Sequence, residues 1–124
     1  MHLDTHVALW LYAREFRRIP AAARSRLDSQ ELRFSPMALL ELAYLHEIDR
    51  IVDDADTVMG DLSSRFELAV ASTPFALVSA AARTMAWTRD PFDRIIAAQA
   101  TVDSATLLTA DPTILGNVTS AWWP

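Results

Sequence analysis

The chain has no cysteine, no lysine and only two glycines among its 124 residues. The absence of cysteine excludes disulfides, cysteine-ligated zinc and thiol catalysis, and it is consistent with a reducing cytoplasm. Two glycines are too few for a glycine-rich phosphate loop, and neither a GxGxxG nor a P-loop pattern is present. No apolar run approaches the roughly 20 residues of a membrane helix, and the N-terminus lacks the basic and apolar regions of a signal peptide. We therefore expect a cytoplasmic protein that does not enter a membrane.

The composition is typical of a single globular domain. Hydrophobic residues make up 52% of the chain and charged residues 22%, which excludes a disordered protein. A domain near this length buries roughly two-thirds of the surface of its unfolded chain. We find no internal repeat, low-complexity segment or linker, so the sequence predicts one domain over residues 1–124.

Charge is unevenly distributed along the chain. The net charge of −5 argues against a molecule that binds polyanions over its whole surface. All 11 basic residues are arginine, however, and five of them fall in one short stretch: Arg14, Arg17, Arg18, Arg24 and Arg26. The guanidinium fork suits bidentate phosphate contacts. Two interpretations stay open, a solvated helix face in an arginine-biased sequence and a local phosphate-binding patch.

Short apolar segments alternate with helical periods, a pattern that predicts an α/β fold with a parallel sheet. Strands are expected over 1–4, 31–35, 75–78 and 106–109, with a last edge strand in 121–124. Helices are expected over 7–11, 21–28, 57–71, 79–87 and 90–103, and after Ser35-Pro36 and Asp111-Pro112. At Ser35-Pro36, Asp90-Pro91 and Asp111-Pro112 a capping side chain precedes proline at the first helical position, which is a strong start signal.

Four acidic residues lie where apolar segments begin or break: Asp4, Glu41, Asp93 and Asp111. Carboxylates in such surroundings are costly to desolvate unless a cation meets them. Asp4 and Asp111 follow predicted strands, and ligands of parallel sheets bind beyond the carboxyl ends of strands. Four carboxylates gathered there would repel one another, and a hard divalent cation such as Mg²⁺ or Mn²⁺ would relieve that repulsion. The sequence therefore predicts one metal-binding pocket.

Some of the acidic residues also have a purely structural interpretation. Asp90 and Asp111 have the positions of helix N-caps, worth about 0.5–2 kcal/mol each. Asp93 has the position of the acidic partner in a capping box. Asp4 and Glu41 have no evident structural role in the sequence. We interpret His2, His6 and His46 as core or solvent residues, because His46-Glu47 lacks the second histidine of a zinc protease motif.

Several motifs resemble those of a known family when read in order along the chain. They are Leu3-Asp4-Thr5-His6 with Ala8-Leu9-Trp10, Ser35-Pro36 leading to Glu41-Leu42, Arg89-Asp90-Pro91-Phe92-Asp93-Arg94 with Ala97-Ala98-Gln99-Ala100, and Leu108-Thr109-Ala110-Asp111-Pro112. Together they resemble the PIN domain superfamily, specifically its VapC-type toxins. The resemblance covers nearly the whole chain, and its Asp-Pro-Phe-Asp-Arg segment is distinctive.

The resemblance implies a three-layer α/β/α sandwich around a parallel sheet. It implies a Mg²⁺- or Mn²⁺-dependent endoribonuclease that a VapB-like antitoxin inhibits, commonly a homodimer. The family's acids fall on Asp4, Glu41, Asp93 and Asp111. Asp90 is a secondary candidate at the pocket edge. Further candidates are the hydroxyls of Thr5 and Thr109 and, for RNA positioning, Arg14, Arg17 and Arg18.

Three other functions compete with this one. A haloacid-dehalogenase-type phosphohydrolase needs Asp-x-Asp after its first strand, and Asp4-Thr5-His6 breaks that pattern. A receiver-type signalling domain relies on a late lysine, which this chain lacks. A non-catalytic interaction module would use its acids only as helix caps. Trp122 and Trp123 either cover a sheet edge or form part of an apolar surface for a partner.

Overall fold

Five short strands form a fully parallel sheet in the computed structural model, which describes residues 1–124. The strands are β1 (His2–Leu3), β2 (Arg33–Phe34), β3 (Ala69–Val70), β4 (Leu107–Leu108) and β5 (Ala121–Trp122). Their order in the sheet is β3-β2-β1-β4-β5, and β1 pairs with β2 on one side and with β4 on the other. The predicted parallel sheet is confirmed, and so is the edge strand at the C-terminus.

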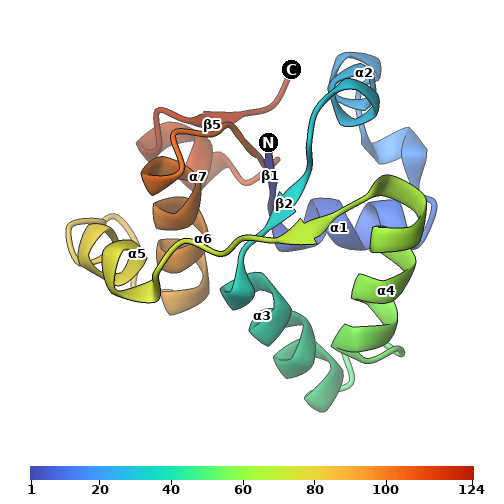
Figure 1. Cartoon of the computed structure of the whole chain (residues 1–124), viewed down its shortest axis with the longest axis horizontal. Helices are drawn as coiled ribbons and strands as arrows, with labels where there is room; N and C mark the ends of the chain where they lie inside the picture. The colour runs from blue at the N-terminus through green and yellow to red at the C-terminus, as the bar shows by residue number, and fades with distance from the viewer.

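Helices connect every pair of consecutive strands. They are α1 (Thr5–Tyr12), the 3₁₀ turn η1 (Phe16–Arg18), α2 (Ala21–Ser29), α3 (Pro36–Glu47), α4 (Ala55–Phe66), α5 (Phe75–Ala82), α6 (Pro91–Val102) and α7 (Pro112–Asn117). Because parallel crossovers are right-handed, the reversal of strand order after β3 sends α5, α6 and α7 to the opposite side of the sheet. Figure 1 shows α1, α2 and α4 on one side of the strands and α5, α6 and α7 on the other. The three-layer α/β/α sandwich is confirmed.

Three helices begin at the cap-plus-proline signals in the sequence. The Ser35 hydroxyl accepts a hydrogen bond from the Met37 N–H at the start of α3. Asp90 and Asp111 cap α6 and α7 in the same way, each followed by proline at the first helical position. Each cap satisfies an amide left without a partner in the first turn, and proline has no such amide to lose. These starts matter for function because all three lie at the carboxyl edge of the sheet.

The core lies on both faces of the central strands. Leu3, Phe34, Leu107 and Leu108 are at most 1% exposed. Burial on both faces is the rule for all-parallel sheets, and it explains why these strands appear in the sequence as short apolar runs. No helix of the chain is long and apolar enough to cross a membrane.

Three element predictions in the middle of the chain were wrong. The helix expected over 57–71 ends at Phe66, since Glu67 takes a left-handed φ of 53° and the chain continues into β3. The strand expected over 75–78 is the first turn of α5, and the helix expected over 79–87 is the rest of α5, which ends at Ala82. A four-residue apolar run does not distinguish a strand from a helix. Here Val78 and Ala82, one turn apart, both pack against α6, and that packing decides for the helix.

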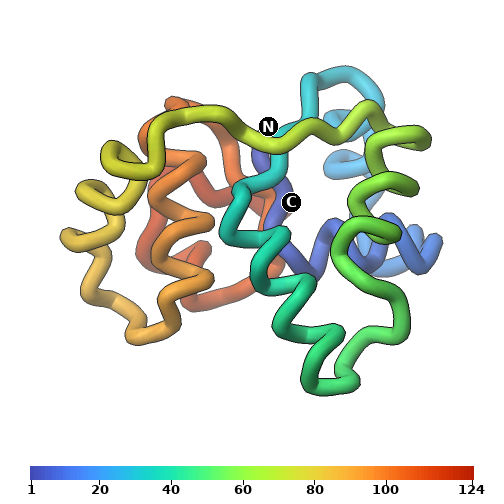
Figure 2. Tube along the Cα trace, turned by 60° about the horizontal axis from the view of Figure 1, so that its bottom comes forward, coloured from blue at the N-terminus to red at the C-terminus, as the bar shows by residue number.

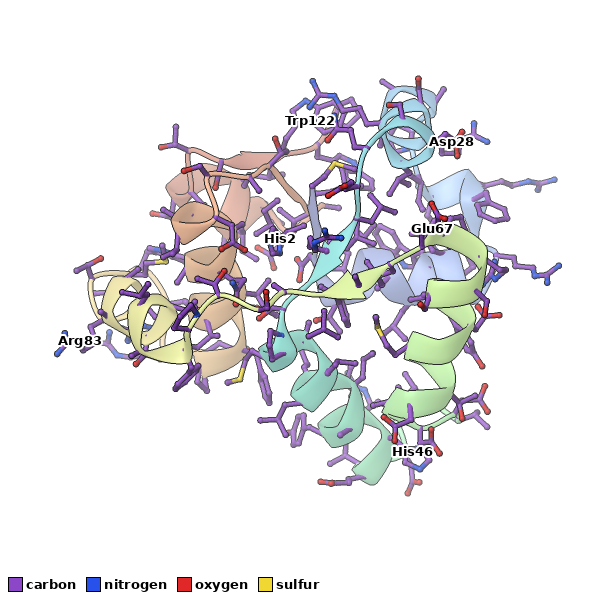
Figure 3. The ribbon with its side chains drawn as sticks, in the orientation of Figure 1. His2, Asp28, His46, Glu67, Arg83 and Trp122 are labelled. Atoms are coloured by element: carbon purple, nitrogen blue, oxygen red, sulfur yellow. The ribbon has the colours of Figure 1, made fainter.

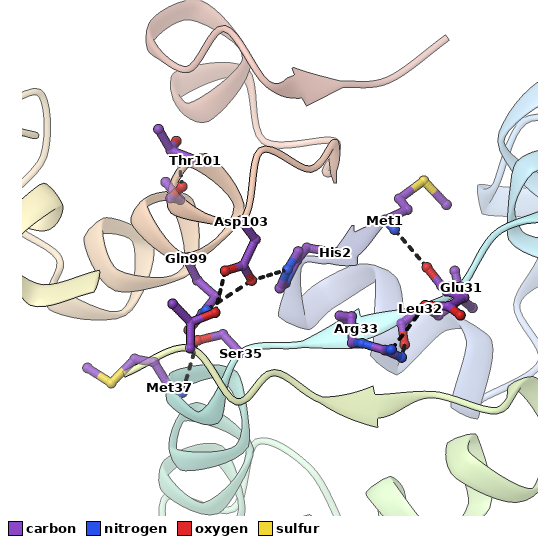
Figure 4. A network of polar contacts seen from close by, with 12 residues as sticks. Met1, His2, Glu31, Leu32, Arg33, Ser35, Met37, Gln99, Thr101 and Asp103 are labelled. Carbon is purple, nitrogen blue, oxygen red and sulfur yellow. Dashed lines mark hydrogen bonds and ion pairs between the residues drawn. The ribbon is translucent and has the colours of Figure 1, made fainter. Parts of the chain in front are cut away.

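A buried polar network ties β1 to the end of α6 (Figure 4). The His2 Nε2 lies 2.8 Å from an oxygen of Asp103, which also accepts hydrogen bonds from Gln99 and Thr73. Burial lowers the pKa of His2, so the imidazole is favoured in its neutral form. Burial raises the pKa of Asp103. The hydrogen bonds from Thr73 and Gln99 and the interaction with His2 together lower it by more, so the pKa of Asp103 lies below its usual value. His2 is thus a core histidine, as expected.

Candidate active site

Asp4 lies at the end of β1 and is only 4% exposed. One carboxylate oxygen accepts a hydrogen bond from the Thr5 N–H at 2.7 Å, and the other accepts one from the Thr109 hydroxyl at 2.6 Å. Thr109 is completely buried at the end of β4, the strand beside β1. Two donors on two segments therefore fix the orientation of this carboxylate before any ligand binds.

Thr109 also links Asp4 to Asp111. Its hydroxyl donates to Asp4 and accepts a hydrogen bond from the Asp111 N–H at 3.0 Å. The Asp111 carboxylate in turn accepts hydrogen bonds from Thr113 N–H and Ile114 N–H, at 2.7 and 3.0 Å, and so caps α7. The structural interpretation of Asp111 as a helix cap is therefore correct. Its second carboxylate oxygen has no hydrogen bond and remains available to a ligand.

His6 is part of this site, which the sequence reasoning missed. Its Nδ1 lies 3.2 Å from the Asp4 carboxylate, and its Nε2 accepts a hydrogen bond from the Ala110 N–H at 3.1 Å. An imidazole nitrogen that accepts a hydrogen bond carries no proton, so we assign the neutral tautomer with the proton on Nδ1. His6 then donates to Asp4 as a third orienting group. The one signal in the sequence was its place two residues after Asp4.

Glu41 and Asp93 complete the site from two helices. Glu41 lies in the second turn of α3, and Asp93 in the first turn of α6. The Tyr44 and Phe92 rings stack across these helices with centroids 5.7 Å apart and so join α3 to α6. Figure 2, in which this side of the molecule comes forward, shows α3 between α6 and α4. Both acids are half-buried.

The electrostatic state of these two carboxylates differs from that of ordinary acids. Burial, followed by the negative charges of Asp90, Asp4, Glu41 and Asp111, raises the pKa of Asp93 from 3.8 to about 7. Burial also raises the pKa of Glu41, with a smaller contribution from Asp4 and Asp90 and a partial offset from the nearby Thr5 hydroxyl. Neither carboxylate forms an ion pair, and the buried Thr5 hydroxyl has no hydrogen-bond partner. A site with this much uncompensated negative charge attracts a cation.

Asp90 is an exposed helix cap at the margin of the site. Its carboxylate accepts hydrogen bonds from the Phe92 and Asp93 N–H groups, at 2.8 and 3.4 Å. The Asp90 N–H donates to the Thr88 hydroxyl at 3.1 Å rather than to Asp93. The capping-box interpretation of Asp93 is therefore wrong, and its carboxylate caps no amide of α6.

The donor set suits a hard divalent cation. The structure brings Asp4, Glu41, Asp93 and Asp111 to one edge of the sheet, close enough for Asp93 to experience the charges of the other three. All of these groups offer carboxylate oxygen, the ligand that Mg²⁺ and Mn²⁺ prefer. No three of the side chains already lie at the spacing of a complete metal cage. Mg²⁺ needs no such cage, since it keeps several waters and takes few carboxylates directly.

The predicted RNA-positioning arginines lie on the exposed surface around η1. Arg18 forms an ion pair with Glu15 and lies over the Trp10 ring, 5.5 Å from its centroid. Arg14 and Arg17 are exposed and have no carboxylate partner. Their role in RNA binding stays a prediction.

The terminal tryptophans pack against α1 and α2. Trp123 packs edge-on against Trp10, with centroids 5.9 Å apart, and the Arg26 guanidinium lies 3.9 Å from the centroid of Trp122. Both tryptophans are half-buried against the main core, and Figure 3 shows Trp122 beside α2. Arg26, one member of the N-terminal arginine stretch, is thus occupied by an aromatic contact.

Residues 1–116 match the PIN domain family, and the chain belongs to that family. Its structure is similar to a crystal structure of VapBC2 from Rickettsia felis bound to a DNA fragment from their promoter. The TM-score is 0.65, the sequence identity is 16%, and the alignment covers 98% of this chain and 97% of the other. At that identity the likeness concerns the fold alone. None of the curated proteins matches this chain in sequence.

Proposed function

We propose that the chain is a metal-dependent endoribonuclease, the toxin of a VapBC-type toxin–antitoxin pair. The observation that carries this proposal is the meeting of Asp4, Glu41, Asp93 and Asp111 at one sheet edge, where burial and then the neighbouring negative charges raise the pKa of Asp93 to about 7. Membership of the PIN domain family supports nuclease chemistry, and the fold of the VapBC2 structure supports the VapC type.

The four acids would hold Mg²⁺ or Mn²⁺. When bound, the cation supplies Lewis-acid chemistry: it polarises the scissile phosphate, acidifies a bound water and stabilises the departing oxygen. The chain's own contribution begins with Asp4, whose orientation is set by Thr5, His6 and Thr109. Such support usually matters, because outer hydrogen bonds keep metal-binding carboxylates in a productive geometry.

Glu41 and Asp93 are the two acids free to change protonation state. Neither is tied to a helix cap, and the pKa of each is raised toward the range in which a carboxylate accepts a proton from water. We propose that whichever of the two does not hold the cation accepts the proton of the attacking water on its carboxylate oxygen.

A non-catalytic module would leave these two residues unexplained. Helix capping accounts for Asp90 and Asp111, and partly for Asp4. It does not account for Glu41 inside α3, nor for Asp93, whose carboxylate caps nothing. Placing two unpaired carboxylates beside three others costs stability, and a fold that needed only caps would gain nothing from that cost.

We also propose the biological setting that the resemblance implies. Residues 1–124 would form one catalytic domain in the cytoplasm, inhibited by a VapB-like antitoxin and assembled as a homodimer. Exposed apolar side chains on α3 and α5 support the need for partners: Leu40 is 57% exposed, Phe75 66% and Leu77 57%. Exposed apolar groups of this size favour contact with another chain.

Isothermal titration of Mn²⁺ tests the site directly. The wild type should bind, and Asp93→Ala should lose most of that affinity. Asp28→Asn is a matched control, because Asp28 is an exposed acid on α2 with no ion pair (Figure 3). Equal Mn²⁺ affinity in the wild type and Asp93→Ala would contradict the site.

Cleavage of RNA tests the activity itself. The purified wild type should cut a single-stranded RNA in Mn²⁺ and not in EDTA, and Asp4→Asn should abolish that cleavage. Retention of cleavage in Asp4→Asn would exclude the proposed site, whereas no cleavage by the wild type in Mn²⁺ would make the interaction module the better interpretation.

A further inference from the structure

A cleft lined by three arginines lies between the end of α5 and the start of α6. Arg83, Arg89 and Arg94 line it, and its volume is about 330 Å³. The other lining residues, Ser79, Ala82, Pro91 and Ile95, are uncharged, so no carboxylate faces the cleft. The cleft is therefore positively charged, although the chain as a whole has a net charge of −5.

Arg94 anchors the cleft and keeps its shape. Its guanidinium donates to the Ala82 carbonyl at 3.0 and 3.1 Å and to the Arg83 carbonyl at 3.2 Å. These carbonyls lie at the C-terminal end of α5, where the helix supplies no i+4 amide for them, although the Met85 N–H also donates to Ala82 at 3.1 Å. Arg94 therefore joins α5 to α6 and leaves its positive charge at the wall of the cavity.

Arg83 and Arg89 are free to bind a ligand. Both are exposed, and neither forms an ion pair. Figure 3 shows Arg83 at the end of α5, on the margin of the molecule. By contrast, Arg33 and Arg65 are paired with carboxylates, and Arg26 lies on an aromatic ring. Two unpaired guanidiniums beside a third are suited to the oxygen atoms of a phosphate group.

The cleft adjoins the acidic site through the first turn of α6. Arg89 immediately precedes Asp90, and Arg94 immediately follows Asp93. Consecutive residues of a helix point about 100° apart, so Arg94 and Asp93 face different sides of the same turn. A nucleic-acid strand that crosses this turn would pass from a cluster of negative charges to a cluster of positive ones.

We propose that this arginine cleft binds a backbone phosphate of the nucleic-acid strand, next to the phosphate that is cleaved. The inference rests on the proposed nuclease function and adds the position of a substrate contact. The acidic site repels the strand, and the cleft offsets that repulsion at a neighbouring phosphate without placing a cation among the carboxylates. It also assigns phosphate binding to arginines other than those around η1.

The salt dependence of RNA binding tests the cleft. The probe is a fluorescein-labelled single-stranded RNA of 12 nucleotides, titrated by anisotropy in EDTA at several NaCl concentrations. Each lost phosphate contact lowers the slope of log affinity against log salt by about 0.7 for a single strand. We expect Arg83→Gln with Arg89→Gln to lower the slope by about 0.7–1.4 and to weaken binding at low salt roughly tenfold.

Two variants serve as controls for this measurement. Arg24→Gln removes an exposed arginine of α2 that lies outside the cleft, and its slope should match the wild type. Arg89→Lys keeps the charge and should retain most of the binding. Circular dichroism melting shows that each variant is folded, and Arg94 is left intact because it joins α5 to α6.

The outcomes separate this inference from the function on which it rests. An unchanged slope in the double variant contradicts phosphate binding by the cleft, even if the wild type cleaves RNA in Mn²⁺. A wild type that fails to bind the probe at 50 mM NaCl contradicts it as well. So does a double variant that still binds the RNA probe and loses only the binding of a protein partner. If the double variant lowers the slope as expected but the wild type does not cleave RNA in Mn²⁺, the nuclease proposal fails and the phosphate site stands.

Discussion

The substitution Asp93→Asn should stabilise the protein in the absence of metal. Asp93 is half-buried among four other carboxylates, and its pKa is raised from 3.8 to about 7. The folded state therefore keeps a proton that the unfolded chain has already lost. Asparagine has nearly the same shape and no charge, so it removes this repulsion. Loss of function and gain of stability should occur in one variant.

The size of the effect follows from the raised pKa. One pH unit corresponds to about 1.4 kcal/mol, so the rise corresponds nominally to about 4 kcal/mol. Solvent screens a half-exposed carboxylate, which reduces the expected gain to about 1–2 kcal/mol. For a chain of this length, that gain should raise the melting temperature by roughly 3–10 °C.

The sign of the pH dependence gives a second check. An acid whose folded pKa is raised contributes stability that is complete below pH 3.8 and is lost as the pH rises to about 7. The difference between Asp93→Asn and the wild type should therefore grow from pH 4 to pH 7 and stay constant above. Urea unfolding in EDTA at pH 5, 6, 7 and 8 measures it.

Metal should reverse the order of stability. A cation that binds only the folded wild type at about 100 times its dissociation constant adds about 2.7 kcal/mol. Addition of Mn²⁺ should then raise the melting temperature of the wild type and leave that of Asp93→Asn almost unchanged. If Asp93→Asn is less stable than the wild type at pH 8 in EDTA, the acids do not repel one another and the reasoning fails.

Three further substitutions test the contacts around the site and in the core. Thr109→Val removes the buried hydroxyl bonded to Asp4 and should cost about 1.5–3 kcal/mol in urea unfolding, whereas Thr109→Ser should cost far less; equal costs would show that packing alone matters. His6→Phe keeps an aromatic ring but loses the contact to Asp4, so it should weaken Mn²⁺ binding about 10–100-fold in titration calorimetry and leave the melting temperature nearly unchanged. If His6→Phe binds Mn²⁺ as tightly as the wild type, His6 is not part of the site. Asp103→Ala leaves buried donors such as His2 unpaired, so it should lower the free energy of unfolding by about 1–3 kcal/mol at pH 7, while RNA cleavage per folded molecule stays the same. A loss of cleavage would mean that the network around Asp103 shapes the site.

Much of the architecture was predictable from local chemistry. The signals Ser35-Pro36, Asp90-Pro91 and Asp111-Pro112 each started a helix where expected, since a cap and a proline act within one turn. The short apolar segment 75–78 was not predictable, because its choice between strand and helix depended on α6, which lies elsewhere in the sequence. Likewise, the role of Glu67 in ending α4 left no clear mark in the sequence.

The candidate site divides in the same way. Residue types and order along the chain determined which acids to consider, and strand ends indicated that Asp4 and Asp111 would meet. Only the folded chain decided that Thr109 joins those two acids, that His6 donates to Asp4, and that Asp93 caps nothing. These contacts are between side chains on different elements. The arrangement of those elements depends on the packing of the whole core, which no short sequence segment encodes.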